Sequence, residues 1–174
     1  MKKYVEQIVV AEPNWCVPAA LEMVLKHHGI NSLTQWEIAG CLDIVPASDK
    51  VEHNKWGAKI KQNTLNDLFV RNAIPLREKY ISISQFMDEF FMSQKLAELL
   101  LRNVSIICGY NYTSLFGCRE DFFQHVSIVV DILPDFSGIL LLDPGPKDAG
   151  YKVVKSDDLF YAIKAAKDGL WCIE

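Results

Sequence analysis

The spacing of apolar residues changes near residue 103, and this change constrains the fold most strongly. Before it, apolar residues recur three or four positions apart, which is typical of helices. The predicted helices cover about residues 16–28, 32–42, 64–72 and 84–101. After it, short β-branched runs predict strands over about residues 104–110, 125–132, 139–142 and 170–173, with one helix at 157–167. A short strand or an extended lead-in is expected at 4–10, and a further short strand at 76–81.

Helices therefore dominate the first hundred residues and strands the remainder. This segregation predicts an α+β fold with an antiparallel sheet, because a parallel sheet would need helices and strands in alternation. A length of 174 residues suits one domain. Neither half contains a complete core, so we expect 1–174 to be a single domain with a helical lobe at 1–103 and a sheet lobe at 104–174.

Charge and cysteine content exclude several classes of protein. The net charge is −4 and no long basic run occurs, which argues against a nucleic-acid partner. No apolar run has the length of a membrane span, and no signal peptide is evident, so we expect a cytoplasmic protein without membrane insertion. Five cysteines without a Cys-x-x-Cys pair predict reduced thiols and no metal site.

One cysteine lies where an extended segment becomes a helix. Pro18 fits the first turn of that helix, where its missing N–H is not needed, and Gly29 supplies a left-handed stop. Cys16 therefore faces the free N–H groups and the positive end of the helix dipole. This environment stabilises a thiolate, so Cys16 is a candidate nucleophile.

The hairpin formed by the strands at 125–132 and 139–142 supplies two further polar groups. Closing it through the turn at 134–137 places Asp143 opposite about Ile128, at the same end of the sheet as His125. A hydrogen bond from the His125 Nδ1–H to the Asp143 carboxylate is then within reach. A thiolate, an imidazole and an orienting carboxylate are the components of a nucleophilic acyl-transfer site.

Three short segments resemble the papain-like cysteine peptidases. The sequence NWCVPAA at 14–20 resembles their nucleophile helix, HVSIVV at 125–130 their histidine strand, and LDP at 142–144 an Asp-Pro turn. The nucleophile segment looks most like the bacterial branch that includes the bacteriocin-leader-processing peptidases of exporters, and the order Cys, His, Asp and its spacing also fit. The resemblance implies a papain-like fold, a peptide or protein substrate, no cofactor, and a catalytic triad of Cys16, His125 and Asp143.

The chain departs from that branch around the nucleophile. Val17 follows the cysteine where the branch usually has glycine, and Val10 occupies the usual position of the oxyanion-hole glutamine. Gln7 and Asn14 are the candidates to replace that glutamine, with the Cys16 backbone N–H as a further donor. The sequence carries no nucleotide-binding motif or transporter segment, so we do not expect it to be the exporter protein itself.

Each of these residues also has an ordinary structural interpretation. Cys16 could be a buried core cysteine, His125 a core histidine with its hydrogen bonds satisfied, and Asp143 a turn residue before Pro144. The whole chain could be a catalytically weak relative that binds a peptide or protein partner, or an acyltransferase that uses the same triad. The oligomeric state does not follow from the sequence.

Overall fold

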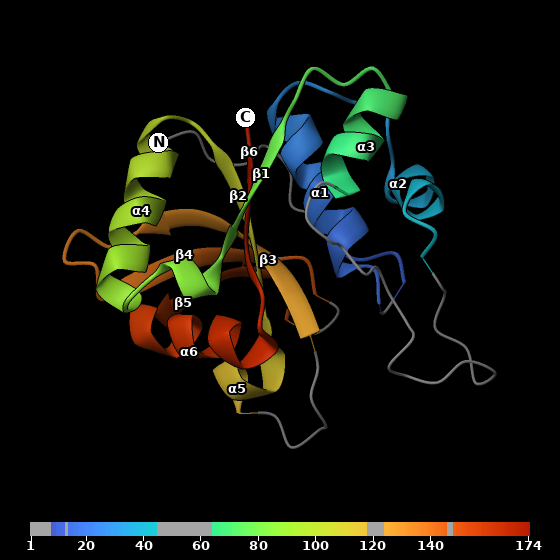
Figure 1. Cartoon of the computed structure of the whole chain (residues 1–174). Coiled ribbons are helices and arrows are strands. Elements are labelled where there is room, and N and C mark those ends of the chain that lie inside the picture. Colours follow the sequence, from blue (N-terminus) through green and yellow to red (C-terminus); the bar gives the residue numbers. More distant parts are fainter. Residues whose placement is uncertain (1–7, 13, 45–63, 118–123, 146–147) are drawn as a thin grey trace. The chain divides into compact units, whose positions relative to one another are not determined.

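The computed structural model describes residues 8–12, 14–44, 64–117, 124–145 and 148–174. The chain divides into two compact units (Figure 1). The first contains Met1–Arg77 and Pro144–Gly150, and the second contains Glu78–Asp143 and Tyr151–Glu174. The proposed nucleophile therefore belongs to the first unit, and the proposed histidine and aspartate belong to the second.

The described helices of the first unit are α1 (Cys16–His27), α2 (Gln35–Cys41) and α3 (Thr64–Arg71). Nine consecutive residues of α1, from Val17 to Leu25, are buried, as expected for a helix that is apolar on most of its surface. Gly29 has φ of +76°, and the following Ile30 N–H donates to the Leu25 carbonyl at 2.9 Å, which closes the helix end. The expected boundaries of α1 are confirmed to within one residue.

Side chains connect the start of α2 to α1. Thr34 and Glu37 form the predicted capping box, in which the Thr34 N–H donates to Glu37 Oε2 at 2.7 Å. The Gln35 N–H donates to the buried carboxylate of Glu22 on α1 at 3.0 Å, and Glu22 also pairs with Lys26. These polar contacts fix the first turn of α2 against α1.

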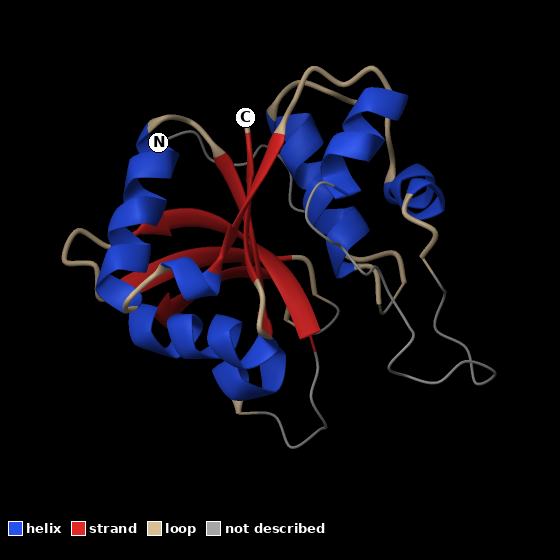
Figure 2. Cartoon of the chain, viewed as in Figure 1, coloured by secondary structure: helices blue, strands red, loops and turns tan. Residues whose placement is uncertain are grey.

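The second unit contains a sheet of six strands in the order β1-β6-β2-β3-β4-β5 (Figure 2). The strands are β1 (Glu78–Ser82), β2 (Ser105–Asn111), β3 (Gln124–Ile132), β4 (Gly138–Asp143), β5 (Gly150–Lys155) and β6 (Gly169–Ile173). The pairs β1–β6, β6–β2, β2–β3 and β3–β4 are all antiparallel. The predicted α+β class with an antiparallel sheet is confirmed.

Helices α4 (Glu89–Leu101) and α6 (Ser156–Ala166) pack on one face of this sheet (Figure 1). Their apolar side chains form a core with β2, β3 and β4. The largest members of that core include Met92, Leu96, Leu159, Phe160, Ile106 and Tyr110. The short helix α5 (Tyr112–Phe116) follows β2 directly and places Tyr112 and Phe116 at the margin of the core.

Three sequence predictions are wrong in detail. The helix expected at 84–101 begins only at Glu89, because Asp88 caps it through the Phe91 N–H, while residues 83–85 form a separate 3-10 turn, η2. The loop expected after Asn111 contains α5. Strand β5 was not predicted. Residues 8–10 have no regular secondary structure, which fits the extended lead-in and not the strand; residues 4–7, Gln7 included, lie outside the described residues, as does most of the loop expected at 43–57.

Candidate functional site

Cys16 is the first residue of α1 and is partly exposed. Trp15 precedes the helix, and its carbonyl accepts the Ala19 N–H at 3.0 Å, which is the first bond of the helical ladder. The N–H groups of the first turn have no partner within a helix, so they are directed toward the region of the thiol. The sequence prediction that Cys16 opens a helix is confirmed.

The other described cysteines occupy different environments. Cys41 is partly exposed at the end of α2, whereas Cys108 and Cys172 are buried in β2 and β6. Burial raises the pKa of the Cys108 and Cys172 thiols to about 12 each. These two thiols are therefore neutral at physiological pH and are poor nucleophiles. Cys118 lies outside the described residues.

His125 and Asp143 form a buried pair in the second unit. The His125 Nε2 lies 2.8 Å from Asp143 Oδ1, and each side chain is only 1% exposed. The register pairs Ile128 with Leu142, so one further step places Asp143 opposite Ser127, within one residue of the expected position. His125 is then the diagonal neighbour of Asp143 on the same face of the sheet.

The ring nitrogen that Asp143 contacts differs from the expected one. The expected contact was between Nδ1 and the carboxylate, but in the structure Nε2 makes it. Diagonal neighbours on adjacent strands are separated by about 7–8 Å between backbones, so the far edge of the imidazole spans the gap. An Nε2–H that donates to Asp143 leaves Nδ1 as the basic nitrogen of the neutral ring.

A lysine that the sequence analysis did not identify completes this cluster. Lys152, on β5, donates through Nζ to Asp143 Oδ2 at 2.7 Å, and its side chain is 17% exposed. Asp143 thus uses one oxygen for His125 and the other for Lys152. Burial lowers the pKa of Lys152, but the hydrogen bond and charge of Asp143, with a smaller contribution from Tyr112, outweigh it and raise the pKa above its usual value.

Aromatic rings surround the cluster. The ring centroids of Tyr110 and Tyr112 lie 5.7 and 5.3 Å from that of His125, both nearly perpendicular to it. The Lys152 Nζ lies 4.8 Å from the centroid of the Phe116 ring, within the range of a cation–π interaction. The Tyr110 hydroxyl and Ser127 Oγ are 2.9 Å apart. Asp143 itself is fully buried, and in such low-dielectric surroundings its two polar contacts are stronger than they would be in water.

Gln35 fixes the backbone ahead of Cys16. Its Oε1 accepts the Ala11 N–H and its Nε2 donates to the Val9 carbonyl, both at 2.9 Å. Asn14, a candidate oxyanion donor, lies two residues before Cys16 and is partly buried. The other candidate, Gln7, lies outside the described residues. The structure therefore adds Gln35 as a residue that sequence reasoning missed, since its position on α2 gives no signal for this contact.

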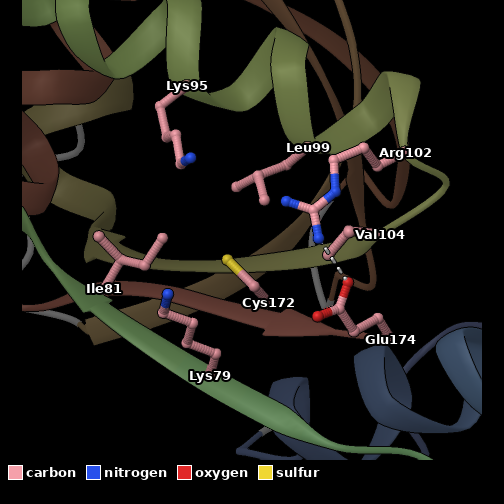
Figure 3. Close-up of a pocket in the computed structure, with 8 residues that line it drawn as sticks. All are labelled: Lys79, Ile81, Lys95, Leu99, Arg102, Val104, Cys172 and Glu174. Atoms are coloured by element: carbon pink, nitrogen blue, oxygen red, sulfur yellow. Dashed lines mark hydrogen bonds and ion pairs between the residues drawn. The ribbon is translucent and has the colours of Figure 1, made fainter.

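A separate pocket of about 70 Å³ lies among β1, β6, α4 and the start of β2 (Figure 3). Its lining combines basic and apolar side chains: Lys79, Lys95, Arg102, Ile81, Leu99, Val104, Cys172 and Glu174. Lys95 pairs with Glu98 at 2.8 Å and Arg102 with Glu174 at 3.1 Å, so carboxylates of the protein compensate two of the three cations. This pocket contains none of the predicted site residues and is not part of the candidate site.

The described residues offer neither a metal cluster nor a helix that could span a membrane. Within those ranges, no group of three or more His, Cys, Asp or Glu side chains is arranged to hold a metal ion. None of the helices there combines the length and the apolar character that a membrane crossing requires.

Comparison with known proteins places the chain in a family. The model of the family described as Peptidase_C39 like matches residues 2–165. Among solved structures, a candidate C39-like peptidase from Bacillus anthracis superposes with a TM-score of 0.67 at 12% sequence identity, covering 98% of this chain and 94% of that chain. A search of curated proteins finds no match. The expected resemblance to the papain-like cysteine peptidase superfamily and its fold is confirmed.

Proposed function

The chain belongs to the Peptidase_C39-like family, and on that premise we propose that it hydrolyses peptide bonds through Cys16, His125 and Asp143. The observation that carries the proposal is the buried contact of 2.8 Å between His125 and Asp143. A thiol at the start of a helix supplies the third group. In this proposal the two units act together as lobes of one catalytic domain.

The proposed reaction begins with a proton transfer. The His125 Nδ1 takes the proton from Cys16 Sγ, and the sulfur attacks the carbonyl carbon of the scissile peptide bond. Collapse of the tetrahedral intermediate breaks the C–N bond, and Nδ1 returns the proton to the leaving amine, which leaves a thioester on Cys16. Water, deprotonated by the same nitrogen, then attacks the thioester, releasing the acid product and restoring the thiol.

Asp143 supports both steps by holding the Nε2–H of His125. It fixes the ring orientation and the tautomer, and its charge stabilises the imidazolium that forms after each proton transfer. The negative charge on the carbonyl oxygen requires separate donors. We assign this role to the Cys16 backbone N–H together with the side chain of Asn14 or Gln7.

Thiol labelling tests the nucleophile. A small alkylating reagent is expected to modify wild-type protein rapidly at Cys16, and Cys16→Ala should remove this fast phase while the circular dichroism spectrum is retained. Cys41→Ala is the matched control, because Cys41 is also a partly exposed thiol at a helix end, and this variant should keep the fast phase. Equal labelling of wild type and Cys16→Ala would contradict the assignment.

Incubation with a peptide library, read by mass spectrometry, tests the reaction itself. Wild type should release new peptide termini, and Cys16→Ala and His125→Gln should not. An added amine nucleophile distinguishes acyl transfer from hydrolysis, because a transferase would give amide products in place of free acids. Binding of peptides without any turnover would identify the chain as a catalytically weak relative.

A further inference from the structure

We propose that Lys152 is a positioning residue of the candidate site, which holds the Asp143 carboxylate and lowers the proton affinity of His125. This inference rests on the proposed function only for its catalytic consequence. The contacts that carry it lie within the second unit. Lys152 Nζ and His125 Nε2 bind opposite oxygens of one buried carboxylate, at 2.7 and 2.8 Å.

The geometry limits how Asp143 can move. A carboxylate bound on one oxygen alone can rotate about its χ2 angle, whereas two donors on different strands determine its plane. Asp143 is on β4, His125 on β3 and Lys152 on β5. The ammonium is itself held between Asp143 and the rings of Tyr112 and Phe116, so it acts as a fixed donor and not as a mobile surface lysine.

The charge of Lys152 also acts on His125. A second positive charge close to the ring disfavours protonation of the imidazole, while Asp143 favours it. With Lys152 in place, Asp143 is partly neutralised, and the ring is kept in its basic, uncharged form down to lower pH. Among the described residues, Tyr110 and Cys108 on β2 and Tyr112 on α5 face the cluster; burial raises the pKa of the Cys108 thiol to about 12, and Lys152 supplies the positive charge.

Three substitutions separate the charge from the hydrogen bond. Lys152→Arg retains both, Lys152→Gln keeps a donor without charge, and Lys152→Met removes both. The matched control is Lys155→Gln, which removes the same charge from the exposed end of the same strand. The midpoint of the His125 ring titration, followed by NMR on the full chain, is the primary measurement, because it does not depend on catalysis.

We expect Lys152→Gln to raise the His125 midpoint by about one pH unit, in line with the 1–3 units typical of a nearby charge. Lys152→Arg and Lys155→Gln should leave it nearly unchanged. The acid limb of peptide hydrolysis by Lys152→Gln should move to higher pH by about the same interval, so that kcat falls about tenfold near pH 6 while KM changes little. Lys152→Met should show both effects together with lower stability.

An unchanged His125 midpoint in a folded Lys152→Gln protein would overturn the proposal. Unfolding of both neutral variants, with Lys152→Arg folded, would also overturn it, since Lys152 would then be only a structural partner of a buried charge. If wild type hydrolyses no peptide but the midpoint shifts as expected, the proposed function fails and the role of Lys152 in the His125–Asp143 pair stands.

Discussion

The Val10 N–H donates to the Pro144 carbonyl at 3.0 Å. Both residues belong to the first unit, and each is close in sequence to a residue of the proposed triad: Val10 precedes Cys16 by six positions, and Pro144 follows Asp143 directly. Gln35 binds the flanking Val9 carbonyl and Ala11 N–H. Val9, Val10 and Ala11, three successive residues ahead of the nucleophile, are therefore each held by a hydrogen bond of a backbone group.

Gln35→Ala should release this segment. The substitution leaves the Val9 carbonyl and the Ala11 N–H without their partner, and we expect a loss of about 1–3 kcal/mol in the free energy of unfolding. Alkylation of Cys16 should slow because the start of α1 becomes less ordered. Urea unfolding and the labelling rate measure the two effects. The exposed Gln85→Ala variant is the control, and equal behaviour of the two variants would contradict a role for Gln35 in holding the segment.

Asp143→Asn should lower peptide hydrolysis by about 10²–10⁴-fold, because a neutral amide neither fixes the tautomer of His125 nor stabilises its imidazolium. The variant should also lose about 2–4 kcal/mol of stability at pH 7, since the Lys152 charge is left buried without its partner.

The loss of stability in Asp143→Asn has a defined pH dependence. Burial alone lowers the pKa of Lys152 in the folded variant below its value of about 10.4 in the unfolded chain. The penalty is therefore complete below the folded pKa and disappears as pH rises through the unfolded one. Urea unfolding at pH 7 and pH 10 should show the variant approaching wild type at the higher pH, and a constant difference would contradict this account of Lys152.

Much of the site follows from local sequence rules. Helix α1 is predictable because Pro18 and Gly29 mark its ends, and the hairpin containing His125 and Asp143 is predictable because its turn is short and its strands are strongly apolar. The contact of Asp143 with Nε2 of His125, and not with Nδ1, does not follow from such rules. The register also contains a bulge between Val129 and Asp131, whose position a pattern of period two does not encode.

Lys152 and Gln35 could not be identified from local sequence patterns. Strand β5 has a Lys at a partly buried position and exposed Tyr151 and Val153, which is the reverse of the alternation that identifies a half-buried strand. The role of Lys152 follows only from its contact with Asp143 of the neighbouring strand. The contacts of Gln35 likewise join α2 to a segment 24–26 residues earlier, a separation that local spacing does not reveal.

The carboxyl group of Asp168 gives the free energy of unfolding a pH dependence of the opposite sign. Burial raises the pKa of Asp168 to about 6, although its hydrogen bonds with the Gly169 N–H and Tyr80 act in the other direction. The same aspartate ionises near pH 4 in the unfolded chain. Folding therefore opposes ionisation, and this cost grows as pH rises from 4 through 6 and is complete above that.

Asp168→Asn should consequently stabilise the protein at pH 7–8 by about 1–2 kcal/mol. This is less than the roughly 3 kcal/mol that two pKa units represent, because the side chain is partly exposed and solvent screens it. The gain should shrink to a few tenths of a kcal/mol at about pH 4, where the folded state is protonated and the unfolded state is roughly half protonated. Urea unfolding at pH 4, 6 and 8 measures it, and a gain of constant size at all three values would contradict the assigned pKa.

Gly109→Ala tests the close approach of Asp168 to β2. A Cβ at this position would collide with Asp168 Oδ2 and lie 2.9 Å from the ring of Trp171, so we expect a loss of about 1–3 kcal/mol in the free energy of unfolding. Gly40→Ala is the matched control, because a Cβ there has no neighbour within 4 Å and the residue is helical. The control should be neutral or slightly stabilising.

The two positions should also be coupled energetically. In an Asp168→Ala background the carboxyl group that obstructs the new methyl is absent, so Gly109→Ala should cost less there than in wild type, by at least about 0.5 kcal/mol. The four proteins form a double-mutant cycle that urea unfolding at pH 7 can measure. Additive effects would show that Trp171 or the backbone, and not Asp168, is what requires a glycine at position 109.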